Sequence, residues 1–209
     1  MSIVVEHDKR RYEILEKALD VFVDEGFENA TFQKIADRCG ITRTTLYIYF
    51  KNKRDIFNFS IRQLLQILEN DINTVRKEKN LSYTEKLIRV MNVIMTHLIK
   101  NRLLLSVVLD FVVFASKTIA DYDPDLRVRR RTVRLRHIQA TLLIGGIKAG
   151  EFSPAINVKD ANELLYGILE AAVFRLVVLR RDSVDELKDA VRLTVNSFAM
   201  NSPAVKTRR

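Results

Sequence analysis

The sequence predicts an all-α protein, and two observations lead to that prediction. Only six Gly and three Pro occur in 209 residues, so residues that break helices are scarce. Apolar side chains recur at helical spacing along the chain, and no segment alternates apolar and polar residues as a half-buried strand does. We expect a small helical domain over residues 1–52 and a larger helical bundle over residues 53–209.

The first helix is predicted from Lys9 to Glu25. One face of this helix carries apolar residues at positions i, i+3, i+4 and i+7, namely Leu15, Ala18, Leu19 and Phe22. Gly26 follows, and glycine commonly ends a helix because it enters left-handed conformations without steric cost.

Two shorter helices follow, and each has a threonine hydroxyl in position to cap its first turn. Thr31 precedes the second helix, Gly40 marks a tight turn, and Thr42 precedes the third helix. The side chains expected to face inward are Ile35, Ala36, Cys39, Leu46 and Phe50. Two short helices joined by a glycine-containing turn form a helix-turn-helix, whose second helix enters the major groove of DNA.

The charge of this segment suits a nucleic-acid partner. Residues 29–54 contain six basic side chains and a single acidic one, Asp37. The third helix would present Thr42, Arg43 and Thr44 to base edges, because arginine can bind guanine with two hydrogen bonds and threonine can donate or accept. Alternatively, Tyr47 and Tyr49 could be half-buried core aromatics, and the lysines could belong to a solvated helix start.

The stretch TFQKIADRCGITRTTLYIYFKNKRDIF resembles the N-terminal signature of TetR-family transcriptional regulators, approximately T-x-x-x-I-A-x-x-A-G-V-S-x-x-T-L-Y-x-Y-F-x-x-K-x-x-L. The matching residues are Thr31, Ile35, Ala36, Gly40, Thr45, Leu46, Tyr47, Tyr49, Phe50 and Lys53. Cys39, Ile41 and Phe32 depart from the pattern. The resemblance covers about 50 residues, including the first helix.

The resemblance implies a DNA-binding role for particular residues. Thr31 would lie near phosphates at the start of the second helix, and Thr42, Arg43 and Thr44 would contact bases. Thr45, Tyr47 and Lys53 would hold the DNA backbone, and Tyr49 could contact either bases or backbone. The expected partner is a palindromic double-stranded operator, bound by a homodimer that is more plausibly an effector-released repressor than an activator.

The remaining chain predicts a series of further helices. A long helix starts at Lys53 with Asn52 as its N-cap, and a capping box of Ser82 and Glu85 opens the next. The apolar run at 103–115 belongs to another helix, and Asp123 with Pro124 opens a helix that ends near Gly145. A turn at 150–154 precedes the last two helices, at about 159–180 and 184–200.

The last two helices resemble the dimerisation helices of the TetR family. The predicted interface residues are Leu164, Leu165, Ile168, Ala172, Leu187, Val191, Thr194 and Phe198. The alternative is that both apolar stripes pack inside one subunit.

Members of this family carry a cavity for a small-molecule effector in the C-terminal bundle. The candidate lining residues are Met91, Met95, His97, Phe111, Phe114 and Tyr166, although residues of these types more often belong to an ordinary hydrophobic core. The effector could be hydrophobic. It could also be an anion such as an acyl-CoA, because residues 127–137 contain six Arg and no acid. The same arginines could contact DNA, or could form a solvated helix face over Leu135, Ile138 and Leu142.

Other classes of protein fit the sequence less well. The chain has one cysteine, histidines at 7, 97 and 137 only, and no complete nucleotide-binding or hydrolase motif, so we expect no enzyme, no metal site and no cofactor. The arginine run could sit on an anionic membrane or bind nucleic acid without specificity, but those alternatives leave the N-terminal signature unexplained. The N-terminus lacks the pattern of a signal peptide, which predicts a cytoplasmic protein without a membrane partner.

Overall fold

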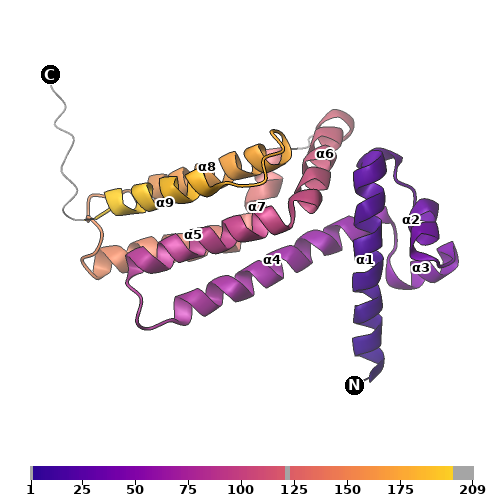
Figure 1. Ribbon diagram of the computed structural model, residues 1–209, viewed down its shortest axis with the longest axis horizontal. Helices are drawn as coiled ribbons and strands as arrows, with labels where there is room; N and C mark the ends of the chain where they lie inside the picture. The colour runs from indigo at the N-terminus through magenta and orange to yellow at the C-terminus, as the bar shows by residue number, and fades with distance from the viewer. Residues whose placement is uncertain (1, 121–122, 200–209) are drawn as a thin grey trace. The chain divides into compact units, whose positions relative to one another are not determined.

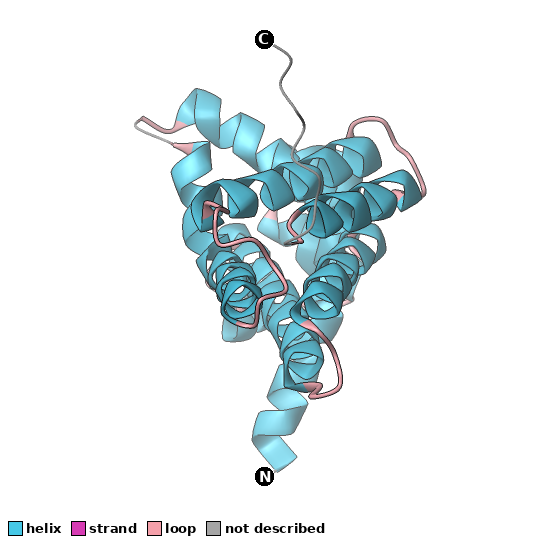
Figure 2. Ribbon diagram, turned by 90° about the vertical axis from the view of Figure 1, so that its left-hand side faces the viewer, coloured by secondary structure: helices cyan, strands magenta, loops and turns pink. Residues whose placement is uncertain are grey.

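The computed structural model describes residues 2–120 and 123–199, with the side chains of 2–5, 124–129 and 131 outside the description. The described residues form helices joined by loops, with an isolated β-bridge between Phe152 and Ala199 (Figures 1 and 2). The helices are α1 (Ser2–Asn29), α2 (Phe32–Cys39), α3 (Arg43–Tyr49), α4 (Lys53–Lys77), α5 (Tyr83–Lys100), α6 (Arg102–Thr118), α7 (Pro124–Lys148), α8 (Val158–Val177) and α9 (Asp185–Ser197). The all-α prediction is confirmed.

The chain folds as two compact units. The first contains Met1–Ile67 together with Asn101–Pro124, and the second contains Leu68–Lys100 together with Asp125–Arg209. The expected division after residue 52 therefore does not match the packing, because α6 belongs with the N-terminal helices. Helix α6 packs against α1, a long-range contact that the sequence pattern of neither helix reveals.

An aromatic cluster forms part of the core of the first unit. The ring centroid of Phe27 lies 5.5 Å from that of Phe22, 5.2 Å from Phe57 and 4.8 Å from Phe111. Aromatic pairs at such separations contribute about 0.5–1.5 kcal/mol each beyond the burial of their surface. This cluster joins α6 to α1 and α4, and so supports the short helices α2 and α3 that pack beside it.

The junction between Gly26 and Phe27 interrupts α1. Gly26 has φ 76° and ψ 158°, a conformation that is essentially restricted to glycine. The break leaves the backbone N–H of Phe27 without a helical acceptor, and it donates to Asp110 Oδ2 of α6 at 2.8 Å. The expected stop at Gly26 is therefore present as a break between two helical segments of α1, and the Phe27 N–H next to it attaches α1 to α6.

The second unit is built around α5, α8 and α9, which pack against one another (Figure 1). Its buried side chains include Leu87, Met91, Leu165, Leu169 and Val191. The predicted capping box forms, since Ser82 Oγ accepts from the backbone N–H of Glu85 at 3.1 Å and the Ser82 N–H donates to the Glu85 carboxylate at 2.9 Å. Glu151 accepts hydrogen bonds from the backbone N–H groups of Tyr83 and Thr84, so these N–H groups at the start of α5 also have acceptors.

Candidate nucleic-acid interface and effector region

Helices α2 and α3 form the predicted helix-turn-helix. The Thr31 hydroxyl accepts from the Lys34 N–H at 3.2 Å, and the Thr42 hydroxyl accepts from the Thr45 N–H at 3.0 Å. Gly40 takes a left-handed conformation with φ 67°, and the next amide, of Ile41, donates back to the carbonyl of Ala36 at 3.1 Å. The two caps and the glycine turn therefore fix where α3 begins, and with it the side chains of its first turn.

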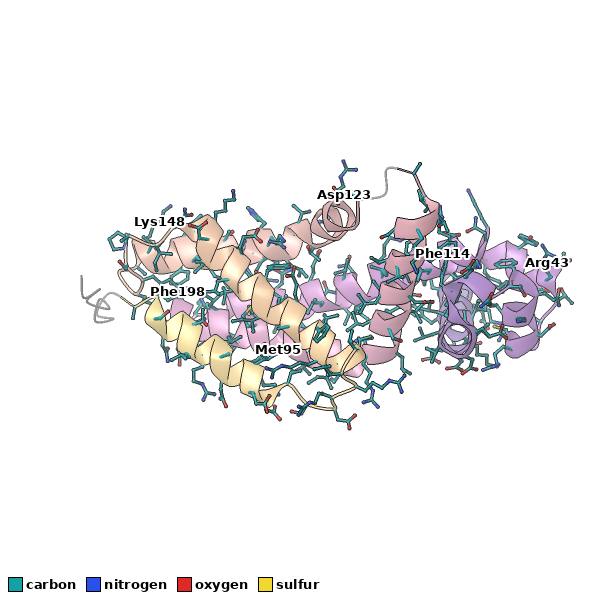
Figure 3. All side chains as sticks on the ribbon, turned by 90° about the horizontal axis from the view of Figure 1, so that it is seen from above. Arg43, Met95, Phe114, Asp123, Lys148 and Phe198 are labelled. Atoms are coloured by element: carbon teal, nitrogen blue, oxygen red, sulfur yellow. The ribbon has the colours of Figure 1, made fainter. Side chains whose placement is uncertain are left out.

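The two faces of α3 differ in burial. Leu46 and Phe50 are buried in the core of the unit, as expected. Thr42, Arg43 and Thr44 are exposed, and Arg43 lies at the periphery of its unit (Figure 3). The three residues expected to contact bases are thus accessible from solvent at the start of the helix.

Tyr47 belongs to the exposed surface rather than to the core. Its side chain is 49% exposed, its hydroxyl accepts a hydrogen bond from Arg43 Nη2 at 3.1 Å, and its ring lies 4.8 Å from that of Phe32. Phe32 thus packs beneath Tyr47 at a position where the family pattern often has a hydroxyl. Ile48, which the sequence reasoning did not single out, is 67% exposed beside it.

Tyr49 and Thr45 lie at the edge of this surface and are half-buried. The ring of Tyr49 lies 4.9 Å from that of His7 on α1. The hydroxyls of Thr45 and Thr42 are 2.8 Å apart, so each constrains the other. Tyr49 and Thr45 therefore lie at the edge of the exposed surface and not at its centre.

Lys53 has a structural position that the motif did not predict. Its ammonium donates to the backbone carbonyls of Phe27, Glu28 and Ala30 at 2.8, 2.7 and 2.9 Å. An ammonium has three donors, and all three are used. Partial burial lowers the pKa of Lys53, while Glu28 acts in the opposite direction. The expectation that Lys53 holds a DNA phosphate is not supported by these contacts, which instead tie α4 to the end of α1.

Comparison with known proteins identifies the helix-turn-helix. Residues 14–58 match the family model described as bacterial regulatory proteins, tetR family. Residues 14–58 are thus a TetR-family DNA-binding segment. The chain is a DNA-binding transcriptional regulator.

Three relatives illustrate how far the similarity extends. The chain is 26% identical over 167 residues to the fatty acid metabolism regulator protein of Bacillus subtilis (strain 168), covering 77% of this chain and 80% of that protein. The ketosteroid transcriptional regulator KstR2 of Mycobacterium tuberculosis superposes with a TM-score of 0.68 at 18% identity, over 91% and 95% of the two chains. FadR from Bacillus subtilis, solved in complex with stearoyl-CoA, superposes with a TM-score of 0.62 at 22% identity, over 90% of this chain and 97% of that chain. The TetR-family fold thus extends over both units.

The residues expected to line an effector cavity are divided between the two units. Met91, Met95 and Tyr166 are buried in the second unit, and His97 Nε2 lies 2.7 Å from Asp71 Oδ2. Phe111 and Phe114, in contrast, belong to the first unit and pack on Phe27. The apolar run of α6 does not show from sequence which unit the helix joins, and the role of these two residues in an effector cavity stays a prediction.

A polar cluster surrounds Tyr166 in the second unit. The guanidinium carbon of Arg136 lies 3.6 Å from the centre of the Tyr166 ring, and Arg136 Nη1 donates to Glu163 at 2.8 Å. The Tyr166 hydroxyl donates to the carbonyl of Thr132 at 3.4 Å, and burial raises the pKa of this hydroxyl. The Arg136 carbonyl accepts from the Asn162 amide at 3.1 Å.

Several buried polar atoms of these helices have no hydrogen-bond partner among the described residues. They are Asn92 Oδ1, Arg136 Nε, Gln139 Oε1 and Asn162 Oδ1. Gln139 is completely buried, and its amide nitrogen donates to the sulfur of Met91. Burying such a group unsatisfied costs about 1–3 kcal/mol. The sequence contained a signal for this cluster, since Gln139 interrupts the apolar stripe of Ile138 and Leu142.

Some arginines of the run on α7 form ion pairs, and others are exposed to solvent. Arg134 pairs with Glu69 at 3.3 Å, Arg136 pairs with Glu163, and Arg130 is exposed. The side chains of Arg127, Arg129 and Arg131 lie outside the described residues. Leu135, Ile138 and Leu142 are buried, as the alternative of a solvated helix face requires.

The stripes assigned to dimerisation face mostly inward. Leu165, Ala172, Leu187, Val191 and Phe198 are buried within the subunit, and Ile168 and Thr194 are half-buried. Leu164 is exposed, as are the large apolar side chains Phe174, Val178, Leu179 and Leu193. Helical periodicity shows that a face is apolar but not which partner covers it, so the assignment of these residues to a dimer interface stays a prediction.

None of the helices described is long and apolar enough to cross a membrane. Across residues 2–120 and 123–199, no group of three or more acidic, histidine or cysteine side chains could hold a metal ion.

Proposed function

We propose that this TetR-family regulator binds a palindromic operator as a homodimer and acts as a repressor that an effector releases. The observation that carries the DNA-binding part is the exposed start of α3, where Arg43 and two threonines stand on a helix anchored by Leu46. A helix end with this chemistry suits base edges in the major groove, and two-fold symmetry suits two half-sites about one helical turn apart.

The experiment is selection of bound duplexes from a random DNA pool by the full chain at near-physiological salt. We expect a palindrome to be enriched, with affinity falling steeply as salt rises, because basic side chains displace counterions from phosphates. Binding that depends on salt but not on sequence would contradict the proposal and favour non-specific nucleic-acid binding.

For the effector we propose a mainly hydrophobic molecule with a polar end that contacts the cluster of Arg136, Gln139 and Tyr166. Two observations support this proposal. The buried amide of Gln139 lacks a partner for its oxygen, and the methionine Met91 beside it has an adaptable shape. The relative solved with stearoyl-CoA makes a fatty acyl-CoA the first effector to test. Release requires that the effector bind the DNA-incompetent conformation better than the competent one.

The effector test uses the selected operator and stearoyl-CoA with the variant Gln139→Leu. We expect stearoyl-CoA to release the wild-type chain from DNA, and the variant to need at least about tenfold more, since 1.4 kcal/mol corresponds to tenfold in binding. The variant should also be more stable, because an unsatisfied buried amide is removed. Leu143→Met, a volume-conserving change on the same helix, is the control for repacking. Equal response of wild type and Gln139→Leu would contradict the assigned contact.

A further inference from the structure

A groove in the second unit has a composition that neither DNA binding nor the polar cluster explains. It has a volume of about 350 Å³ and lies between the end of α4, the start of α5 and the end of α7. Its lining includes Arg76, Lys86 and Lys148 together with Tyr83, Leu142 and Ile144. Lys148 lies at the end of α7 (Figure 3). None of the described residues that line the groove is acidic.

The positive charge of the groove is not compensated. Within the described part of the chain, the contacts of Arg76 and Lys86 are with neutral groups: Arg76 Nη1 donates to the Asn73 side chain at 3.0 Å, and Lys86 Nζ lies 5.5 Å from the centre of the Tyr83 ring. Nearby basic side chains on the same helices behave differently, since Arg89 pairs with Glu78 and Arg134 pairs with Glu69. Three like charges around one hollow repel one another and attract a multiply charged anion.

The carboxylates closest in sequence to the groove are already engaged. Glu151 accepts from the backbone N–H groups of Tyr83 and Thr84, and Glu85 accepts from Ser82. The hydrogen bond from the backbone of Ser82 is the main reason that the pKa of Glu85 is lowered. These carboxylates stabilise the start of α5, and neither lines the groove.

The apolar side of the groove indicates what the anion carries. The ring of Tyr83 lies against Gly145 so closely that a Cβ added there would come within 2.1 Å of a ring carbon. Glycine at 145 therefore lets the ring approach α7 closely. Leu142 is buried behind the groove, and Ile144 is 43% exposed at it. An inorganic ion gains no binding free energy from contact with this apolar surface, whereas a phosphate ester that carries an apolar group does.

We propose that this groove is a second small-molecule site, which binds an organic phosphate. A phosphate monoester carries nearly two negative charges at neutral pH and has three acceptor oxygens. Arg76 can bind two of those oxygens through its planar guanidinium, and the lysines Lys86 and Lys148 add point charges. The apolar part of the ligand lies against Tyr83 and Ile144. This site is separate from the residues proposed to contact the effector that releases DNA.

The probe is 1-naphthyl phosphate, titrated calorimetrically into the full chain at low and at physiological salt. We expect it to bind at least tenfold more tightly than inorganic phosphate, with affinity falling as salt rises. The variant Arg76→Gln, Lys86→Gln, Lys148→Gln should lose at least tenfold in affinity. The control Lys77→Gln, Lys79→Gln, Lys100→Gln removes the same charge from exposed positions that do not line the groove and should keep the affinity.

Three results would overturn the proposal: no binding by the wild-type chain, equal binding by the groove variant, or an equal loss in the control. The single variant Lys148→Gln, at an exposed position, should lower affinity at least about threefold and serves if the groove variant misfolds. The operator selection does not depend on these results, so failure of the groove proposal leaves the DNA-binding proposal standing.

Discussion

Lys51 and Lys53 are two residues apart and carry the same charge, yet the folded chain uses them differently. Lys51 is exposed, and its ammonium is free to meet a phosphate. Lys53 directs its ammonium to three carbonyls at the end of α1. The difference arises because the break at Gly26 leaves carbonyl groups that need donors close to the start of α4.

Replacing Lys53 with Ala should therefore lower the free energy of unfolding by about 1–3 kcal/mol, as expected when hydrogen bonds to a charged group are lost. Equilibrium urea unfolding followed by circular dichroism measures the change. Lys51→Ala is the matched control, and it should weaken DNA binding without affecting stability. A Lys53→Ala protein as stable as the wild type would show that the three contacts contribute nothing.

Arg43 is the side chain best placed to specify a base. We expect Arg43→Ala to cost about 1–3 kcal/mol at one base pair and to relax specificity there, while affinity for other sequences changes little. Binding titrations against single-base operator variants measure this. Arg38→Ala is the control, since Arg38 lies on α2 and pairs with Asp24 at 3.0 Å. Uniform weakening across all sequences would make Arg43 a phosphate contact instead.

At the scale of elements, α1 and α6 meet through backbone geometry as well as through apolar side chains. The positive φ of Gly26 turns the Phe27 N–H towards Asp110. The ring of Phe27 also packs against the ring of Phe111 on α6. Gly26→Ala should destabilise the chain by about 1–3 kcal/mol, because its backbone conformation is unfavourable for other residues and the added Cβ would lie 3.2 Å from Asp110 Oδ2.

Urea unfolding measures that loss, and Gly167→Ala provides the control. Gly167 lies within α8 with open space around the position of a Cβ, so alanine there should be neutral or slightly stabilising. A Gly26→Ala protein with unchanged stability would remove the argument that α1 needs glycine at the break.

The start of α5 gives the chain a pH dependence of known sign. Ser82 lowers the pKa of Glu85 below its ordinary value of 4.5 through a backbone and a side-chain hydrogen bond. A carboxyl group with a lowered folded pKa stabilises the fold above 4.5, and the contribution disappears as the pH falls through the folded pKa.

Glu85→Gln should therefore lower the melting temperature at neutral pH and have little effect well below pH 4.5. Thermal unfolding of both proteins across this range measures the difference. Glu16, exposed on α1 and without a partner among the described contacts, is the control position. A Glu85→Gln effect that does not change with pH would mean that the carboxylate charge is not involved.

At the scale of the whole molecule, the exposed apolar side chains of α8 and α9 fit the proposal of a homodimer. Leu164 is 53% exposed and Leu193 is 74% exposed. Homodimer interfaces bury apolar side chains of this kind. The buried stripe of the same helices is already used by the subunit's own core.

Leu164→Glu combined with Leu193→Glu should convert the dimer to a monomer, as measured by sedimentation. Operator affinity should fall at least about tenfold, because the second half-site no longer binds at high effective concentration. Val133→Glu, an exposed apolar position on α7, is the control. A double variant that stays dimeric would place the interface elsewhere.

The helices, the caps of α2, α3 and α5, and the exposed start of α3 followed from the sequence. Each depends on interactions within a few residues, such as Thr31 with Lys34 or Ser82 with Glu85, so local spacing is sufficient to predict them. The family signature has the same local character, which is why the helix-turn-helix could be predicted from the sequence.

Only the tertiary structure decided which partner each apolar or charged face meets. The apolar run of α6 packs on Phe27 rather than with Met91, and Lys53 binds carbonyls from residues 23 or more positions away. The groove of Arg76, Lys86 and Lys148 joins three helices that are distant in sequence. Periodicity defines a face of a helix, but the partner of that face is set by packing between distant segments, which no local pattern encodes.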